Sequence, residues 1–537
     1  MPKVSVIVPV YNPGGDIDDL IASLLGQTLA REELELIFVD DGSDDGTPAR
    51  LDALAAEHAH VLVEHIPNSG WPGRPRNVGL AMATGDYVFF ADNDDWLAAD
   101  ALERLHAMAE LDRADIVIGK VVGHGKGVPR RIFEQNLHGV PFESPVLLTL
   151  LTPAKLFRRA LLERHGLRFP EGRRRLEDHV FVVDAYFRAE RISVLADRPV
   201  YHWMRREGAA TASSTRFDAQ RYFDDVAEVL DLVEARTEPG PWREELLSHW
   251  YRGKMLGRVG GRDWLWRDAE WRRELYEAVR ALALERFGED VHDRLPFNLR
   301  LRSKLLRRGD FEALGRLARY ERRLRPVVRI RGIEHGGTHL VIRLESWLGT
   351  PDARLRFERR GERMLWVPPT ENLAGAVGDD DRDVTGELRR ASVDAFLRNV
   401  DDGAEYALPT RTSVRLKAGG ETGWIRPRLA TTVPIAPTAA AAGGPLPPGR
   451  WELHVAVGVA GFSRMTPVLR RGEPLVLTTF APGRIHVGAE APPAPSLPLR
   501  VYRRLPGPVM STVRRTRDAR SSTVMRRWAR AAAASRR

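Results

Sequence analysis

Residues 87–97 read YVFFADNDDWL, an apolar run followed by a cluster of acids. The apolar run Tyr87–Ala91 predicts a buried strand, and the acids of Asp92–Asp95 follow it directly. Alternate carboxylates at the end of a strand suit a hard cation such as Mg²⁺ or Mn²⁺, which prefers oxygen ligands. One carboxylate could hold the metal while its neighbour holds a ribose hydroxyl. The alternative is a helix N-cap, because a helical pattern begins at Trp96.

The same pattern, a strand followed by polar residues, recurs upstream of this stretch. Val4–Val10, Glu35–Val39 and Val61–His65 are strand candidates, and the helical patterns Asp16–Ala30 and Pro48–Ala59 lie between them. Strands that alternate with helices predict an α/β domain, with helices on the faces of a parallel sheet. Ligands bind beyond the carboxyl ends of the strands in such sheets, and the polar clusters fall there.

Two polar clusters lie between these elements. Residues 39–47 read VDDGSDDGT, and their carboxylates suit a base or a ribose because they accept from ring N–H and hydroxyl groups. A turn followed by a helix cap is the competing interpretation. Residues 70–79 read GWPGRPRNVG, in which Arg76 could face a diphosphate, since a guanidinium matches its geometry. The alternative for Arg76 is an exposed arginine on a loop.

Two further clusters follow later in the chain. Glu177 and Asp178 head an apolar helix over Val180–Phe187, and one of these carboxylates could serve as a general base toward an acceptor hydroxyl. The alternative is that these acids cap the helix, where their negative charge interacts favourably with the helix dipole. His202 could be a metal ligand, with Arg206 as a diphosphate partner, although a lone histidine is more often structural.

Taken in order, these segments closely resemble glycosyltransferase family 2 over about residues 1–215. The resemblance rests on VIVPVYN at 6–12, VDDGSDDGT at 39–47, RNVG at 76–79, DNDD at 92–95 and ED at 177–178. It implies a GT-A fold, which is a Rossmann-like mixed sheet, a nucleotide-diphosphate sugar donor and inversion at the anomeric carbon. One departure is Pro75 before Arg76, where the family usually has a small residue.

The resemblance also implies roles for individual residues. Asp41 matches the acid that reads the base, Asp178 is the expected catalytic base, and Glu177 supports it. The expected ligands of a divalent metal, Mn²⁺ or Mg²⁺, are Asp94 and His202. The residues expected to bind the donor are Pro9, Tyr11, Asn12, Asp41, Arg76, Asp92, Asn93 and Arg206.

A narrower resemblance concerns the segments ADNDDWL at 91–97 and LEDHVF at 176–181. With a helical connector and C-terminal β-domains, they are similar to the wall teichoic acid glycosyltransferases that add N-acetylglucosamine to poly(ribitol phosphate). This implies UDP-N-acetylglucosamine as donor, a polymer or lipid-linked acceptor, and a homo-oligomer formed through the C-terminal part.

The remainder of the chain divides by composition. Residues 216–324 predict a helical connector, and residues 325–491 carry short, spaced strand patterns that predict an antiparallel β-sandwich. The sandwich could bind acceptor, form an oligomer or only support the fold. Its tryptophans Trp347, Trp366 and Trp424 could stack on sugars, but we expect them in the core.

Basic charge is concentrated in the tail, residues 492–537. The chain has 82 Lys and Arg against 73 Asp and Glu, and Arg500 to Arg537 alone contain 12 arginines and one acid. The body is therefore close to neutral, which argues against a nucleic-acid binder. The tail could contact anionic lipid or be a solvated, disordered segment.

The absence of cysteine and the first residues of the chain bear on where the protein is located. The chain contains no cysteine and begins directly on a strand pattern, so we expect a cytoplasmic protein that the tail could hold at the membrane. A carbohydrate-binding scaffold with a degenerate GT-A domain is the alternative to an enzyme. All the candidate catalytic acids are present, which favours the enzyme.

Overall fold

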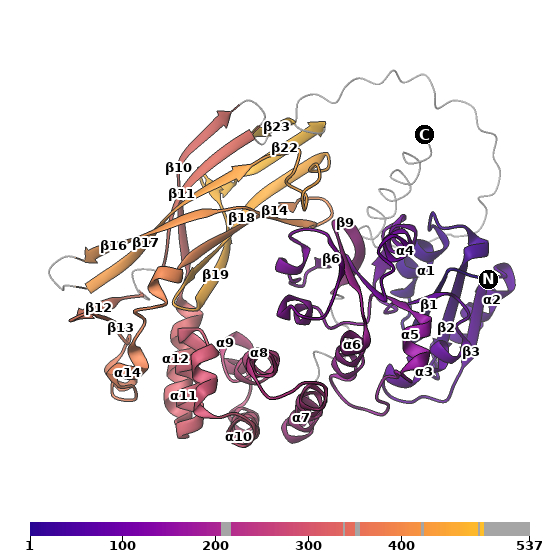
Figure 1. Ribbon diagram of the computed structural model, residues 1–537, viewed down its shortest axis with the longest axis horizontal. Coiled ribbons are helices and arrows are strands. Elements are labelled where there is room, and N and C mark those ends of the chain that lie inside the picture. Colours follow the sequence, from indigo (N-terminus) through magenta and orange to yellow (C-terminus); the bar gives the residue numbers. More distant parts are fainter. Residues whose placement is uncertain (206–215, 337–338, 350–354, 420–423, 482–483, 488–537) are drawn as a thin grey trace. The chain divides into compact units, whose positions relative to one another are not determined.

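The computed structural model describes residues 1–205, 216–336, 339–349, 355–419, 424–481 and 484–487 (Figure 1). Arg206 and the tail at 492–537 lie outside the described residues. The described chain begins with a mixed sheet, continues through a run of helices and ends in antiparallel sheets (Figure 1).

The first sheet begins with four parallel strands in the order β3-β2-β1-β4. These are β1 (Val4–Val10), β2 (Leu34–Asp40), β3 (Val61–His65) and β4 (Tyr87–Phe90). Every residue of β1 and β4 is buried, which explains why these strands are continuous apolar runs rather than alternating ones. The connecting helices are α1 (Ile17–Leu25), α2 (Thr47–Glu57) and α3 (Gly73–Met82).

The second half makes the sheet mixed. Strand β8 runs antiparallel to both β4 and β6, and β9 runs parallel to β6, with β5 and β7 antiparallel to β9. Their bounds are β5 (Trp96–Leu97), β6 (Ile116–His124), β7 (Leu137–Val140), β8 (Leu156–Arg158) and β9 (Ile192–Met204). The helices of this half are α4 (Ala101–Asp112), α5 (Arg159–Arg164) and α6 (Glu177–Arg188). The Rossmann-like mixed sheet that the resemblance implied is therefore present.

The prediction that a helix begins at Trp96 is wrong. Trp96 pairs with His202 in a short strand, and α4 begins only at Ala101 with Asp100 at its N-cap position. The acids of Asp92–Asp95 are therefore not the cap of this helix, and the cap interpretation fails. Pairing with β9 holds this segment extended, which local helical spacing does not reveal.

The middle of the chain is helical, as expected. Its α-helices are α7 (Ala219–Arg236), α8 (Pro241–Trp250), α9 (Gly261–Leu265), α10 (Ala269–Arg286), α11 (Phe297–Arg308) and α12 (Phe311–Arg323). Asp218, Asp268 and Asp310 each cap a helix by accepting a backbone N–H three residues on. A π-helical turn over Tyr251–Leu256 follows α8. In the described chain, no helix is both long and apolar enough to cross a bilayer.

Among the described residues of the C-terminal region, two antiparallel sheets have six strands each, and β20 (Leu469–Arg470) and β21 (Glu473–Pro474) form a small third sheet. The first is formed by β10 (Pro326–Gly336), β11 (His339–Leu348), β12 (Phe357–Arg360), β13 (Arg363–Trp366), β16 (Arg411–Gly419) and β17 (Trp424–Ile435). The second is formed by β14 (Ser392–Asn399), β15 (Glu405–Leu408), β18 (Gly449–Val459), β19 (Phe462–Pro467), β22 (Val476–Ala481) and β23 (Arg484–Val487). Strand β11 alternates buried residues with partly or fully exposed ones, as a sandwich strand does.

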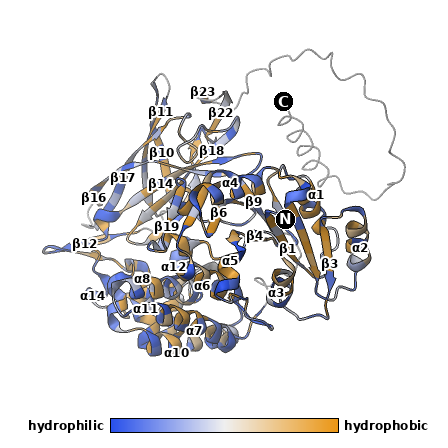
Figure 2. Ribbon diagram, turned by 45° about the vertical axis from the view of Figure 1, so that its right-hand side comes forward, coloured by the Kyte–Doolittle hydropathy of each residue, from blue (hydrophilic) through white to orange (hydrophobic). Residues whose placement is uncertain are grey.

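Trp347, Trp366 and Trp424 fall into two kinds by their exposure. Trp366 is fully buried and belongs to the core, as expected. Trp347 and Trp424 are only half-buried, so the core prediction is wrong for them. Figure 2 shows the apolar and polar residues along the same strands, and their alternation decides which side chains face the core.

Candidate active site

The site is built at the carboxyl ends of β1, β2 and β4. Asp41, directly after β2, is buried, and its two carboxylate oxygens accept from the Ser69 N–H at 2.8 Å and the Ser69 hydroxyl at 2.9 Å. Its own N–H donates to the Val10 carbonyl at 2.8 Å. Burial raises the pKa of Asp41 against the effect of these hydrogen bonds. A carboxylate has four acceptor sites, so Asp41 can still accept from a base.

Asn12 joins the loops that follow β1 and β2. It adopts a left-handed backbone with φ of 43°, which asparagine tolerates better than most residues. Its side-chain amide donates to Asp44 at 2.7 Å and accepts the Asp44 N–H at 2.9 Å. The predicted donor residues beside it differ in exposure: Tyr11 is 51% exposed, whereas Pro9 is buried in β1 opposite Val39.

Arg76 links two acidic motifs that are far apart in the sequence. From α3 it donates to Asp92 at 2.8 Å and to Glu177 at 3.4 Å, and it lies over the Phe169 ring at 5.2 Å. Its side chain is only 5% exposed, so this is a buried charge that needs both partners. The structure shows Arg76 bound to the two carboxylates, and its contact with a diphosphate stays a prediction.

The departure at Pro75 is accommodated by the start of α3. This helix begins at Gly73, so Pro75 lies in its first turn, where backbone N–H groups have no partner within the helix. Position 73 requires glycine because the Pro170 backbone lies against it: a Cβ there would be 2.4 Å from the Pro170 carbonyl oxygen. The unusual sequence therefore keeps Arg76 on the helix face that meets the acids.

The acids after β4 have different environments. Asp95 is buried and accepts the Met204 N–H at 2.8 Å, which ties the loop to β9. Burial, followed by the charges of Asp92 and Asp94, raises the pKa of Asp95 well above its usual range. The Asp92 side chain is 41% exposed and Asp94 is half-buried, so these two carboxylates are the ones within reach of a ligand.

Glu177 and Asp178 occupy the first turn of α6. The residue before them, Leu176, has a left-handed φ of 61°, a strained conformation for leucine that is typical of functional sites. Glu177 accepts from the Trp71 indole N–H at 3.0 Å in addition to Arg76. Burial and the Glu177 charge raise the pKa of Asp178 to about 7.

The His202 side chain contacts two other aromatic rings. Its ring stacks on Trp96, with 3.5 Å between ring centroids, and its Nδ1 lies 3.0 Å from Nε2 of His124. Burial lowers its pKa well below the usual range, so the ring is neutral. Within the described ranges, no three histidine or acidic side chains converge as metal ligands. The oxygen donors of Asp92 and Asp94 suit Mg²⁺ or Mn²⁺, and a bound diphosphate would add more oxygens.

Comparison with known proteins identifies the family. Residues 5–196 match glycosyl transferase family 2, and residues 219–318 match the glycosyl transferase TarS linker domain. The poly(ribitol-phosphate) beta-N-acetylglucosaminyltransferase TarP of Staphylococcus aureus (strain N315) is 31% identical over 264 residues, or 48% of this chain and 80% of that protein. The chain belongs to glycosyltransferase family 2.

Two further similarities agree with this family 2 assignment. The poly(ribitol-phosphate) beta-glucosyltransferase of Bacillus spizizenii is 34% identical over 241 residues, which cover 44% of this chain but only 38% of that protein. The crystal structure of S. aureus TarS 1–349 in complex with UDP-GlcNAc matches with a TM-score of 0.54 at 27% identity, over 63% of this chain and 96% of that structure. The predicted family, enzyme class and GT-A fold are confirmed.

The helical region of this family 2 enzyme contributes to the site, which the sequence analysis missed. The Trp250 indole donates to Nδ1 of His179, the neighbour of Asp178, at 3.1 Å. Lys254 lies in the π-helical turn, a feature frequent at functional sites, and its charge opposes the rise in the pKa of Asp178. The sequence predicts residues 216–324 only as a connector, and the aromatic and basic run at 250–254 is the signal that could have indicated a contribution to the site.

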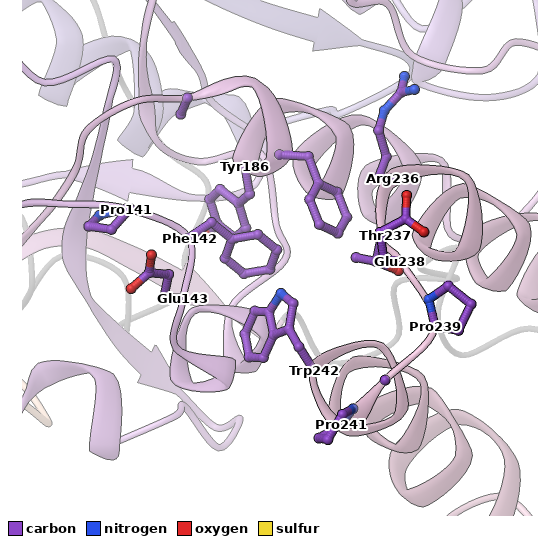
Figure 3. Close-up of a pocket in the computed structure, with 13 residues that line it drawn as sticks. Pro141, Phe142, Glu143, Tyr186, Arg236, Thr237, Glu238, Pro239, Pro241 and Trp242 are labelled. Carbon is purple, nitrogen blue, oxygen red and sulfur yellow. The ribbon is translucent and has the colours of Figure 1, made fainter.

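A pocket of about 500 Å³ lies near the carboxyl end of α6 (Figure 3). Its walls include the rings of Phe142, Tyr186 and Trp242. Tyr186 is near the carboxyl end of α6, whereas Asp178 lies in the first turn of that helix. The pocket is therefore separate from the acidic residues of the family 2 site.

Proposed function

We propose that this family 2 enzyme transfers N-acetylglucosamine from a UDP-sugar to a hydroxyl group of a phosphate-containing cell-wall polymer, with inversion at the anomeric carbon. The observation that carries the proposal is the link from Asp92 through Arg76 to Glu177, beside Asp178. The names of the relatives support the polymer, and the TarS complex supports the donor.

The chemistry is a single in-line displacement at C1 of the sugar. Asp178 removes the proton of the acceptor hydroxyl as its oxygen bonds to C1 and the bond to UDP breaks. Since the pKa of Asp178 is about 7, it can both ionise at neutral pH and accept a proton readily. Asp41 orients the base and Asp92 a ribose hydroxyl, while Arg76 holds Asp92 and Glu177 in place.

A divalent cation fits beside this machinery. Asp94, with Asp92 next to it, would hold Mn²⁺ or Mg²⁺, which would stabilise the charge on the departing diphosphate when bound. Asn93 lies between these two acids on the same loop, where it can contact the donor. Arg206 remains a predicted diphosphate partner outside the described residues.

Location and assembly complete the proposal. We infer that the basic tail, residues 492–537, brings a cytoplasmic enzyme to anionic lipid, and that the C-terminal β-region supports a homo-oligomer. Co-sedimentation with liposomes tests the first idea, since a chain ending at Pro492 should no longer sediment. Equal sedimentation of the two chains would contradict the membrane contact.

Nucleotide release tests the function directly. The purified chain is given UDP-N-acetylglucosamine, UDP-glucose or a GDP-sugar, with poly(ribitol phosphate) or poly(glycerol phosphate) as acceptor. We expect acceptor-dependent release of UDP, highest with UDP-N-acetylglucosamine, and loss of at least about 100-fold in Asp178→Asn. Asp184→Asn, on the same helix but outside the site, is the control. Release without sugar on the polymer, or full activity in Asp178→Asn, would contradict the proposal.

A further inference from the structure

One face of the first C-terminal sheet is densely basic. Residues that pair directly across two strands share a face of the sheet. Arg415 pairs with Arg428, and Lys417 pairs with Arg426, so these basic side chains lie together on the outer side. The alternate residues, such as Leu429 and Leu344, are buried on the inner side. We call this surface the basic face. Its members are Arg329, Arg331, Arg343, Trp347, Arg411, Arg415, Lys417, Trp424, Arg426 and Arg428.

The acids on these strands do not neutralise the basic face. Glu345 is held by Arg331 and Glu334 by Arg343. Across the described part of the chain, the other cations have no salt-bridge partner. They are Arg329, Arg411, Arg415, Lys417, Arg426 and Arg428. Like charges opposite each other on neighbouring strands are unfavourable, so the fold maintains a repulsive arrangement here.

Two tryptophans of this face lie close beneath arginines. The Arg428 guanidinium lies 3.6 Å from the centroid of the Trp347 ring, and Arg329 lies 5.2 Å from it. Arg356 lies 3.8 Å from the ring of Trp424. A stacked guanidinium keeps its N–H edge available for hydrogen bonds to oxygen anions. The half-buried tryptophans therefore orient cations rather than fill the core.

Polar atoms on the face lack acceptors. Nε of Arg426 and Nη1 of Arg428 are buried and have no hydrogen-bond partner among the residues that the structure describes. Burial is the largest cause that lowers the pKa of Arg428; the Glu345 carboxylate opposes it, and the charges of Arg329 and Arg426 add to it. A bound anion would supply the missing acceptors and relieve the repulsion.

We propose that the basic face binds the phosphodiester backbone of the polymer acceptor, outside the catalytic site. Its cations recur at about 5 Å across strands and about 7 Å along them, so several phosphates of one chain can bind together. Each added contact raises the effective concentration of acceptor hydroxyls near Asp178. The inference rests on the proposed function for the identity of the polymer.

Other occupants fit the face less well. A second copy of this chain would bring the same positive charge to the same surface and be repelled. A single-stranded nucleic acid would need open aromatic rings for base stacking, whereas Trp347 and Trp424 are each covered by an arginine. A phosphate polymer without bases matches this face, which offers cations but no open aromatic ring.

Binding of unsubstituted poly(ribitol phosphate) to the full chain tests the inference. Arg415→Gln/Lys417→Gln removes two exposed charges from the face, and Arg389→Gln/Arg390→Gln removes two exposed charges elsewhere in the same region. By calorimetry at 50 mM salt, we expect the first variant to bind about tenfold more weakly and to depend less steeply on salt. The second should stay within about twofold of the unmodified chain.

The outcomes separate this inference from the proposed function. Equal affinity of the two variants, or equal losses in both, would overturn it, as would tighter binding of anionic vesicles or DNA than of the polymer. Arg415→Gln/Lys417→Gln should raise the KM for long polymer but leave transfer to a single ribitol phosphate unit unchanged. A chain that binds polymer through this face without glycosylating it would contradict only the function.

Discussion

Asp178 shows how a single residue combines burial with neighbouring charge. Desolvation favours its protonated form, the Glu177 carboxylate adds to this, and Lys254 and Arg76 oppose it. The resulting pKa of about 7 is close to the value at which a general base works best in neutral solution. Sequence alone shows two adjacent acids and cannot show this balance.

The first prediction concerns pH. The base must be ionised, so kcat/KM should fall as the pH drops through about 7, by about tenfold per unit below it. The raised pKa also means that ionising Asp178 costs stability as the pH rises from about 4 to 7. Asp178→Asn should therefore raise the Tm at pH 8 and leave it almost unchanged at pH 4. A profile without this acid limb would argue against Asp178 as the base.

The second prediction concerns the metal. Treatment with EDTA should lower sugar transfer by at least about 100-fold, and Mn²⁺ or Mg²⁺ should restore it, because the diphosphate leaves with concentrated negative charge. Asp94→Asn should weaken the binding of Mn²⁺ in the presence of UDP, measured by calorimetry. His202→Gln should not, since its ring contacts Trp96 and His124. Turnover unaffected by EDTA would remove the metal from the proposal.

At the scale of elements, the site depends on where helices begin. Helix α6 begins immediately after the strained Leu176, which directs Glu177 and Asp178 toward α3. The π-helical turn after α8 places Lys254 near the same carboxylate. Two helices that are far apart in the sequence thereby control one base.

The third prediction tests the π-helical turn. Lys254→Met removes a cation that stabilises ionised Asp178, so the acid limb of the pH profile should move upward by about half a unit or more. Lys254→Arg keeps the charge and should leave the midpoint close to its original value. Identical midpoints in Lys254→Met and the unmodified chain would show that Lys254 does not act on the base.

The fourth prediction tests the start of α3. In Gly73→Ala the new methyl group would collide with the Pro170 backbone, so the helix or the loop must shift. We expect a loss of about 1–3 kcal/mol in the free energy of unfolding, with reduced activity because Arg76 moves. Gly127→Ala is the control, since a Cβ there meets nothing within 4 Å. Similar denaturation midpoints for both variants would refute the required close approach.

At the scale of the whole molecule, the catalytic domain contacts the C-terminal region. Arg130 binds Glu405 at 3.0 Å, and the Tyr406 hydroxyl donates to the Asp197 carbonyl at 2.9 Å. Lys120 is buried between them, 3.7 Å from the centroid of the Tyr406 ring. This junction connects strands β6 and β9 of the catalytic sheet to β15.

The fifth prediction uses the buried lysine. Burial lowers the pKa of Lys120 to about 7, so its charge costs stability at low pH, and the cost fades as the pH rises from 7 toward 10. Lys120→Met should therefore raise the Tm more at pH 6 than at pH 10. At pH 6 we expect its free energy of unfolding to increase by about 1 kcal/mol. A gain that does not depend on pH would mean that Lys120 stays charged in the fold.

The family, the positions of the first strands along the chain and the acids that follow them can all be predicted from the sequence. These features are local, because an apolar run, a turn and a carboxylate cluster each span no more than about ten residues. It also predicted the helical region and the antiparallel sheets from the change in residue pattern.

Which residues work together depends on the tertiary structure. Arg76 joins acids 16 and 101 residues away, and Lys254 reaches Asp178 from another region of the chain. His202 proved to be a stacked, neutral ring, and Trp347 and Trp424 proved to hold arginines on an outer face. Such contacts depend on strand register and helix packing, which bring together side chains that no short stretch of sequence contains.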